Sequence, residues 1–586
     1  MPVKPITTAL GHSLPPEGPH TITMQLPGWE SAMKIRSGDQ DLLNALVSIY
    51  PRFCPFNEAK DLCTAIHAAL SLPPTHGLLP FTAPDSFAMA RAWATSPLRV
   101  PAEVKLAPGE LVFYVVDIGS VRLYVVAHPL AKTKGIIGLW KNAGTGVSTR
   151  LAAELLKVGV AETLTVVPFE TSAGGAGGGE GEATAAAATG DVGEDSLELE
   201  VERVPVSTYL PEGEAHQLLR ERIASLLRRA PAVLGRSGEV KAVEATTDKE
   251  VVADDVYLYP TGMAAIYRLH QAISSVREGA VVALGSLFQS TWYLFVEEGE
   301  KGFKHFGECD EGSGVMDALE RYLMDEVKEG RRISYVFVEF PSNPILVSVN
   351  LKRLRELADR YEFPIVVDDT VGSFCNIDVL PVADIIMTSV TKSFSGYANV
   401  MGGTLALNPN LPHYATLKAT LTSLFHNEYF LGDAEQLLVN SNDYLARSAI
   451  LNRNALALAN FLHNFYVNTS SPVTKVLYPT LSASHDNYRA FMRPPTAEFP
   501  HPGYGCLLSI EFETKAYARA FYDNLQLIWG GDPSDAAYHA AYGVRGEQIR
   551  VSVGLEDEQD LIDTFREAMG FAEEEKRRAT TGAIME

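Results

Sequence analysis

The chain has 586 residues, 46% of them hydrophobic, and a formal net charge of −23. Its length allows several globular units with a large core. Its negative charge disfavours nucleic acid or an anionic membrane surface as the main partner. No apolar run approaches the roughly 20 residues that cross a bilayer, and residues 1–20 lack the apolar stretch of a secretory signal. The five scattered cysteines form no CxxC pair, so we expect a reduced, cytoplasmic protein without a metal site.

The first half of the chain contains an unusual segment between two short structured regions. Residues 111–116 and 121–127 predict a pair of strands, and residues 221–229 predict a short amphipathic helix. Between them, Thr171–Glu200 is small, polar and acidic, which predicts a disordered surface insert. Its glycines lack the preceding strand and following helix of a dinucleotide-binding loop.

From Val256 onward, short apolar strands alternate with helices. The predicted strands are residues 256–260, 280–285, 333–340, 364–369 and 383–390, and the predicted helices are 262–276, 316–330 and 350–363. This alternation is typical of a mostly parallel sheet covered by helices on both faces. A helical span follows at 413–465, and strands at 506–514 and 549–556 indicate a smaller C-terminal α/β unit.

Polar residues follow several of these strands, at the edge where open parallel sheets bind ligands. Gly262 opens a helix, Asp368 ends a strand, and Ser389, Thr391 and Lys392 follow the next strand. Each alone has an ordinary explanation, such as a surface lysine or a turn-capping aspartate. Together they supply a phosphate cradle, a carboxylate and an amine, which are the groups that pyridoxal 5′-phosphate (PLP) requires.

Several longer motifs resemble one enzyme family. YPTGMAAIYR, VEFPSNPIL, SVTKSFSGYANVMGG and IRVSVGLEDEQDLI occur in the order found in the Cys/Met-metabolism family of PLP-dependent enzymes, most like the fungal cystathionine γ-synthases. The resemblance implies the α/β fold type I of aspartate aminotransferase, with a large, mostly parallel seven-stranded sheet domain and a smaller C-terminal α/β domain. It implies four regions: an N-terminal segment at 1–70 that contacts a neighbouring subunit, a branch-specific insertion at 71–250, a PLP-binding domain at 251–410, and a helical connection with the small domain at 411–586.

The resemblance also implies roles for the residues on the cofactor side. Lys392 is similar to the lysine that forms the Schiff base with PLP, and Asp368 to the carboxylate that pairs with the pyridine nitrogen. The phosphate would be bound by the backbone N–H groups of Gly262 and Met263, with hydroxyls from Ser389 and Thr391.

Further residues are assigned to the substrate and to the neighbouring subunit. Asn343 resembles the asparagine near the cofactor oxygen and the substrate carboxylate, and Arg550 resembles the arginine that binds that carboxylate. Tyr50 and Arg52 match a Tyr-x-Arg pair that reaches the phosphate from a neighbouring subunit. The resemblance therefore implies a homo-oligomer, at least a dimer and by analogy a tetramer.

Two departures from the family pattern lie on the substrate side. Phe288 stands where the family usually has a tyrosine stacked on the cofactor ring, so a hydroxyl is lost while the stacking face remains. Trp529–Asp535 replaces the family's Ser-Leu-Gly loop. Both changes leave the cofactor expectation intact and leave the reaction open.

We therefore expect γ-replacement on an O-acylhomoserine, with cysteine as the nucleophile and cystathionine as the product, as in transsulfuration and methionine biosynthesis. A specialised relative that uses another nucleophile, or that acts as a lyase, is the first alternative. A paralogue that has lost turnover is the second. All three hypotheses imply that the protein binds small amino-acid ligands, and none of them implies a nucleic-acid or membrane partner.

Overall fold

A computed structural model describes residues 8–13, 18–96, 103–168, 209–228, 233–234, 240–241, 249–299, 301–307, 314–468, 470–525 and 545–585. The predicted insert at Thr171–Glu200 and the loop Trp529–Asp535 lie outside these residues. Among the helices described, none combines the length and the apolar character needed to cross a membrane.

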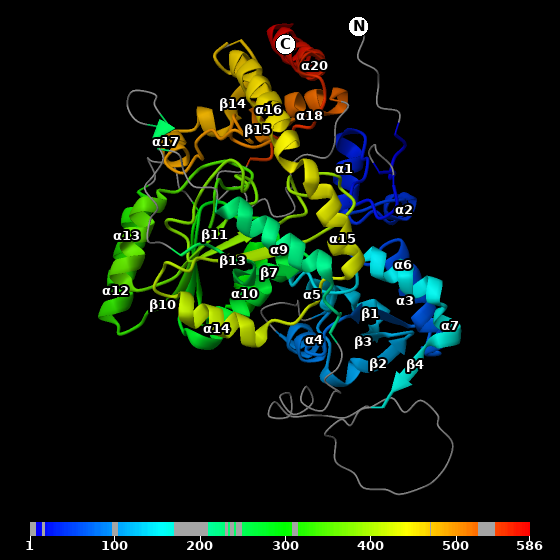
Figure 1. Cartoon of the computed structure of the whole chain (residues 1–586). Coiled ribbons are helices and arrows are strands. Elements are labelled where there is room, and N and C mark those ends of the chain that lie inside the picture. Colours follow the sequence, from blue (N-terminus) through cyan, green and yellow to red (C-terminus); the bar gives the residue numbers. More distant parts are fainter. Residues whose placement is uncertain are drawn as a thin grey trace, which may run out of the picture.

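A seven-stranded sheet forms the centre of the molecule (Figure 1). Its strand order is β7-β13-β12-β11-β10-β8-β9. β13 pairs antiparallel with both β12 and β7, and the other neighbouring strands pair in parallel. This confirms the predicted large α/β domain with a mostly parallel sheet. The strands are β7 (Val256–Tyr259), β8 (Ala280–Leu284), β9 (Phe303–Phe306), β10 (Ile333–Glu339), β11 (Ile365–Asp368), β12 (Ile385–Thr388) and β13 (Gly403–Leu407).

Both faces of this sheet are buried, which explains why its strands are apolar throughout. Successive residues of β10 alternate between two cores: Tyr335 and Phe337 join one core, and Val336 and Val338 join the other. The first core also contains α10 (Gly262–Val276), α11 (Gln289–Glu298) and α14 (Tyr414–Leu424). The second contains α9 (Glu214–Leu227), α12 (Val315–Lys328), α13 (Leu351–Tyr361) and α15 (Leu431–Asn440).

An N-terminal α/β unit packs against the α10 side of the large sheet, and the two share one continuous core. Its four-stranded sheet has the order β1-β3-β2-β4, and the predicted strand pair forms the antiparallel β2 and β3. Its strands are β1 (His76–Phe81), β2 (Val112–Ile118), β3 (Val121–Pro129) and β4 (Thr165–Val167), and its helices are α3 (Glu58–Ala69), α4 (Ser86–Thr95), α5 (Ile137–Asn142), α6 (Thr149–Val158) and α7 (Val160–Thr163).

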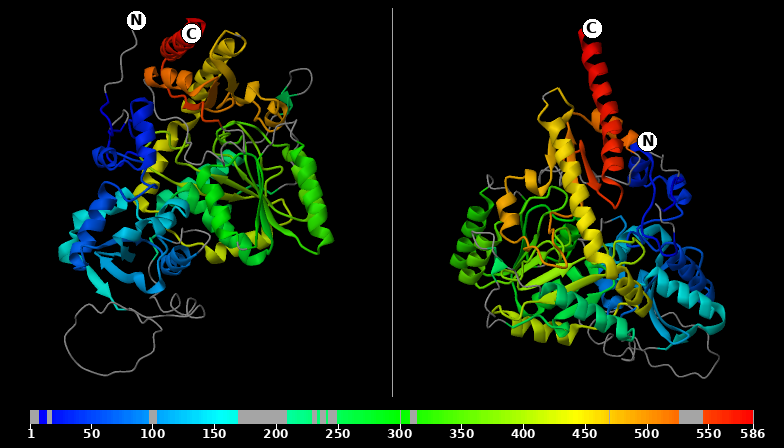
Figure 2. Two further views of the ribbon diagram at one scale, coloured as in Figure 1. Left: turned by 180° about the vertical axis from the view of Figure 1, so that it is seen from behind. Right: turned by 45° about the horizontal axis from the view of Figure 1, so that its top comes forward.

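The predicted helical span contains α14, α15 and the long α16 (Tyr444–Tyr466), which leads into the C-terminal domain. There the antiparallel sheet β14 (Val473–Leu477), β15 (Leu507–Phe512) and β16 (Gln548–Ser552) packs with α18 (Lys515–Asn524) and α20 (Glu558–Met585). The first helix, α1 (Gly28–Ser37), packs on α18 of this C-terminal domain (Figure 2). It is followed by α2 (Gln40–Ala45). The remaining strands and α-helix described are the short strands β5 (Val233–Leu234) and β6 (Val240–Lys241) and the helix α17 (His485–Arg489).

Candidate active site

A cavity of about 950 Å³ lies at the carboxyl-terminal edge of the large sheet, and most of the predicted site residues line it. Residues of the N-terminal segment and of the C-terminal domain also line it. The predicted residues in its lining are Tyr50, Arg52, Gly262, Met263, Phe288, Asn343, Asp368, Ser389, Lys392 and Arg550.

The turn from β7 into α10 forms an anion-binding position at the base of the cavity. Thr261 caps the helix by accepting a hydrogen bond from Ala264 N at 2.9 Å. A Cβ at Gly262 would lie 2.8 Å from the Cβ of Ser389, so glycine is required for this close approach. The first N–H groups of α10 and the Ser389 side chain therefore lie beside one another, as a phosphate site requires.

Thr391 does not line this cavity in the described structure. Its hydroxyl donates to the carbonyl of Gly402 at 3.1 Å and accepts from the N–H of Gly402 at 3.0 Å. The side chain therefore ties the segment after β12 to the start of β13. The contact of this hydroxyl with the cofactor phosphate, which the resemblance implies, stays a prediction.

Asp368 is a buried carboxylate at the end of β11. Its Oδ1 accepts a hydrogen bond from Thr370 N at 2.9 Å. Burial raises the pKa of the Asp368 carboxyl from 3.8 to about 6. A cation placed beside this buried carboxylate, such as a protonated ring nitrogen, would favour its charged form.

Glu339 is a functional candidate that the sequence reasoning missed. It ends β10 directly beside Asp368 in the parallel register, and burial, followed by the charge of Asp368, raises the pKa of its carboxyl well above the ordinary value. Its carboxyl oxygens accept hydrogen bonds from the N–H groups of Phe288 and Asn343. Glu339 therefore fixes two turns that border the cavity. The signal was available as a charged residue at the end of an otherwise apolar strand.

Lys392 points into the cavity next to Tyr50. Its Nζ lies 4.9 Å from the centre of the Tyr50 ring. Burial opposes ionisation of the phenol, but the charges of Lys392 and Arg52 outweigh it and lower the pKa of Tyr50. Two other lysines, Lys141 and Lys515, also line the cavity, but only Lys392 follows the strand that adjoins β11 and Asp368.

Arg52 is 3% exposed and lies between the cavity and the N-terminal unit. Its Nη1 donates to the carbonyl of Lys141 and, at 3.3 Å, to Ser290 Oγ. Its guanidinium carbon lies 5.3 Å from the centre of the Phe288 ring. Among the residues that the structure describes, its buried Nη2 has no hydrogen-bond partner, a costly state that a bound anion would relieve.

Asn343 and Arg550, which both line the cavity, contact each other. Arg550 Nη1 donates to Asn343 Oδ1 at 2.9 Å. Arg550 lies on β16 of the C-terminal domain, whereas Asn343 follows β10 of the large sheet. A guanidinium held in this way presents further N–H groups to a carboxylate.

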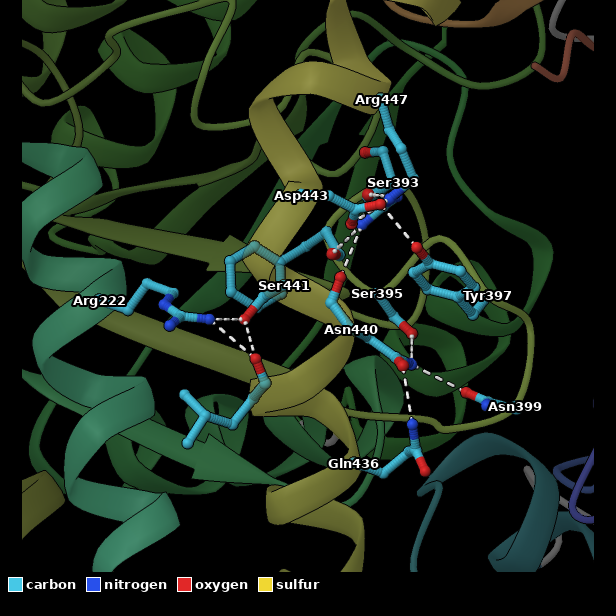
Figure 3. A network of polar contacts seen from close by, with 12 residues as sticks. Arg222, Ser393, Ser395, Tyr397, Asn399, Gln436, Asn440, Ser441, Asp443 and Arg447 are labelled. Carbon is cyan, nitrogen blue, oxygen red and sulfur yellow. Dashed lines mark hydrogen bonds and ion pairs between the residues drawn. The ribbon is translucent and has the colours of Figure 1, made fainter. Parts of the chain in front are cut away.

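The loop after Lys392 is held by the buried Arg447 (Figure 3). The Arg447 guanidinium donates to the carbonyls of Ser393 and Phe394 at 2.9 and 3.0 Å, and to Asp443 at 2.8 Å. Next to it, Asn440 donates to Ser395 Oγ at 3.0 Å. The backbone around Lys392 has no regular secondary structure, and these bonds hold it in place.

Comparison with known proteins identifies the class. A family model described as Cys/Met metabolism PLP-dependent enzyme matches residues 235–531. The cystathionine gamma-synthase of Neurospora crassa is 29% identical over 97% of this chain and 99% of its own length. The alanine racemase ungC of Aspergillus violaceofuscus is 33% identical over 77% of this chain and 74% of its own. A solved cystathionine gamma synthase of Xanthomonas oryzae covers 62% of this chain and 100% of its own, with a TM-score of 0.46 and 22% identity.

The fold and the matched region define a PLP-dependent enzyme of fold type I. The chain belongs to the Cys/Met-metabolism family of PLP-dependent enzymes. The residues present fit this cofactor, since the unpartnered Arg52 Nη2 and the tight Gly262–Ser389 approach suit its phosphate and Asp368 suits its ring nitrogen. Tyr50 and Arg52 lie outside the matched range, and their origin from a neighbouring subunit stays a prediction.

A substitution at Gly396 tests the contacts between Arg447 and the loop after Lys392. Its φ is +73° and a Cβ there would collide with the Arg447 guanidinium. We expect Gly396→Ala to lower the free energy of unfolding by about 3 kcal/mol, because backbone strain adds to loss of charged hydrogen bonds. Gly330 has a φ of +70° and open space around it, so Gly330→Ala is the control and should cost about 1 kcal/mol. Equal losses in urea unfolding would contradict the role of Arg447.

Asp368 should make stability depend on pH in the protein stripped of its cofactor. A pKa raised from 3.8 to about 6 means that the folded state binds this proton more tightly than the unfolded chain, so its carboxylate destabilises the fold as pH rises from 4 to 6. Asp368→Asn keeps the acceptor for Thr370 N–H. We expect it to be more stable than the wild type by about 3 kcal/mol at pH 8 and equal to it below pH 4. Unfolding curves that keep the same gap at both pH values, or match the exposed control Asp254→Asn, would refute this.

Proposed function

We propose that the protein catalyses PLP-dependent γ-replacement on an O-acylhomoserine and forms cystathionine from cysteine. The observation that carries this proposal is the gathering of Lys392, Asp368 and Arg550 around one cavity. In this assignment Lys392 attaches the cofactor, Asp368 holds its ring nitrogen and Arg550 binds the substrate. The name of the Neurospora crassa relative supports the same reaction.

Each residue has a defined task in the proposed reaction. When bound, PLP supplies an electron sink that stabilises negative charge at the substrate's α-carbon. The Lys392 amine removes and returns protons along the substrate chain, within the field of the neighbouring Tyr50 phenol. Asp368 keeps its charge against the ring nitrogen because the two neutralise each other in a buried setting. The γ-acyloxy group then leaves as a carboxylate, and the cysteine sulfur takes its place.

Arg550 and Asn343 orient the amino-acid substrate. The guanidinium presents N–H donors to the substrate α-carboxylate in a two-bond arrangement. The bond from Arg550 to Asn343, at 2.9 Å, restricts its rotation. Holding the carboxylate at this point directs the remainder of the substrate toward Lys392 and lowers the entropic cost of reaction.

A second candidate function is γ-substitution with a larger, apolar nucleophile. It is favoured by one wall of the cavity, which the N-terminal segment builds from Ile22, Met24, Trp29, Ala32 and Met33. Cysteine offers little apolar surface to such a wall. An apolar nucleophile would gain binding energy there in proportion to the area it buries.

The setting of the proposed enzyme follows from the family resemblance. We propose a cytoplasmic homo-oligomer, at least dimeric, that acts in transsulfuration for methionine biosynthesis. Phe288, which offers no hydroxyl, is assigned to stacking on the cofactor ring.

Lys392→Ala tests the assignment of the attaching lysine. We expect it to lose both the visible absorbance of the lysine-linked cofactor and turnover, by roughly 10²–10⁴-fold or more, because attachment and proton transfer depend on one amine. Lys515→Ala, which changes another lysine of the cavity, should keep the absorbance. With wild-type protein, O-acetylhomoserine and cysteine should yield cystathionine by mass spectrometry. A 2-oxo acid and ammonia alone would indicate a lyase, and no turnover with bound PLP would indicate a paralogue without activity.

Trp29→Ala separates the two candidate reactions. Trp29 packs edge-on against Tyr522, with ring centres 5.8 Å apart, and lines the cavity. If cysteine is the nucleophile, Trp29→Ala should change kcat/KM for cysteine less than about 3-fold. The kcat/KM for a long-chain alkanethiol should fall about 10-fold or more, because the variant loses apolar contact with the chain. Trp292→Ala is the control, since Trp292 does not line the cavity in the described structure. A wild-type preference for the alkanethiol over cysteine would favour the second candidate.

A further inference from the structure

The N-terminal unit has no role in the family resemblance, yet it contacts the segment that carries Tyr50 and Arg52. Trp140 on α5 donates its indole N–H to the carbonyl of Pro51 at 2.9 Å, and both groups are buried. The next residue, Lys141, provides the carbonyl that accepts from Arg52 Nη1. Two consecutive residues of α5 therefore hold two consecutive residues of the Tyr50–Arg52 segment.

The helix that makes these contacts is itself fixed to the large domain of the same chain. Asn142, at the end of α5, donates to Glu297 of α11 at 3.1 Å. The loop that follows contacts the start of α10, where Thr261 donates to the carbonyl of Gly144 at 2.9 Å. A Cβ at Gly144 would collide with the Thr261 hydroxyl. The N-terminal unit is thus fitted closely to the proposed phosphate position.

The chain before the segment is also bound to its own subunit. Ile22 N donates to the carbonyl of Ala398, in the loop after Lys392, at 2.8 Å. Trp29 N donates to Asp523 of α18 at 2.6 Å. After the segment, α3 begins at Glu58 and packs on α6. Transfer of Tyr50 and Arg52 to another subunit would break contacts on both sides of the segment.

From these contacts we infer that each chain completes its own cofactor site: α5 of the N-terminal unit holds Tyr50 and Arg52 over the cavity of the same chain. This inference rests on the proposed roles of Lys392 and Arg52. It differs from the neighbouring-subunit arrangement that the family resemblance implies. It also gives the N-terminal α/β unit a function. The unit positions Tyr50 and Arg52 at the cavity of its own chain, whereas the resemblance assigns these two residues to a neighbouring subunit.

The decisive experiment combines two defective chains in one oligomer. Lys392→Ala and Arg52→Met are coexpressed with different affinity tags, and doubly tagged oligomers are isolated and titrated with PLP. If each site belongs to one chain, no site has both residues, and we expect only the PLP affinities of the two single variants, each measured on its own as a reference. A class of sites that combines wild-type PLP affinity with the lysine-linked absorbance would overturn the inference. The readout is cofactor binding, so the test holds whichever product the enzyme forms.

The result remains informative if the chain does not associate. A wild-type monomer that binds PLP more tightly than monomeric Arg52→Met supports the inference, and a monomer with no such advantage overturns it. If Arg52→Met binds PLP as tightly as the wild type in any state, the assigned role of Arg52 is wrong, and the inference fails with it while the Lys392 assignment stands.

Trp140→Phe tests α5 as the positioning element. It removes the bond to the Pro51 carbonyl and keeps an aromatic ring in the core. We expect PLP affinity to fall about 3- to 10-fold, in the range of one lost hydrogen bond at a buried carbonyl. The control is Tyr124→Phe, which removes a polar group from a buried side chain on β3 in the same core and should leave PLP affinity unchanged. Equal affinities for the two variants would contradict the role of α5.

Discussion

The parallel register of β10, β11 and β12 is the constraint on which the site depends. It places Glu339 beside Asp368 and Asp368 beside Met387, which lies five positions before Lys392. Within each strand, the side chains alternate between the two cores, so both carboxylates point to the face that carries α10. A slip of one residue would turn Asp368 toward the opposite core. The amine, the carboxylate and the N-terminus of α10 converge only because hydrophobic pairing of the strands fixes this register.

Three parts of the chain supply most of the cavity lining, and their residues are suited to different functions. The large domain supplies the groups suited to the cofactor, on strand ends and on the first turn of α10. The C-terminal domain supplies Arg550, and the N-terminal segment supplies Tyr50, Arg52 and the apolar wall around Trp29. The cofactor side is thus built on buried strands, which tolerate little change. Arg550 and the apolar wall around Trp29, which are proposed to meet the substrate, lie on peripheral elements together with Tyr50 and Arg52.

The sequence predicted the large domain well because its signals are local. The helix expected at 262–276 is α10 with the same bounds, and the five predicted strands appear within a few residues. The short β13 was missed because its Gly-rich start reads as a flexible loop, and its pairing with β7 joins residues far apart in the chain. The bond between Thr391 and Gly402 could not be predicted for a similar reason, since tertiary folding brings the two residues together. Glu339 was missed because its position beside Asp368 depends on the register of the two strands, and the sequence pattern does not reveal that register.

The replacement of tyrosine by Phe288 becomes understandable once Tyr50 and Arg52 are placed. The Phe288 ring still faces the Arg52 guanidinium at 5.3 Å, so its packing and cation–π contact do not need a hydroxyl. A phenol remains available at Tyr50, whose pKa is lowered by the cations beside it although burial acts in the opposite direction. The phenol beside Lys392 is therefore provided by the segment that α5 holds. In this structure the phenol beside Lys392 comes from Tyr50, and position 288 contributes an aromatic ring beside Arg52.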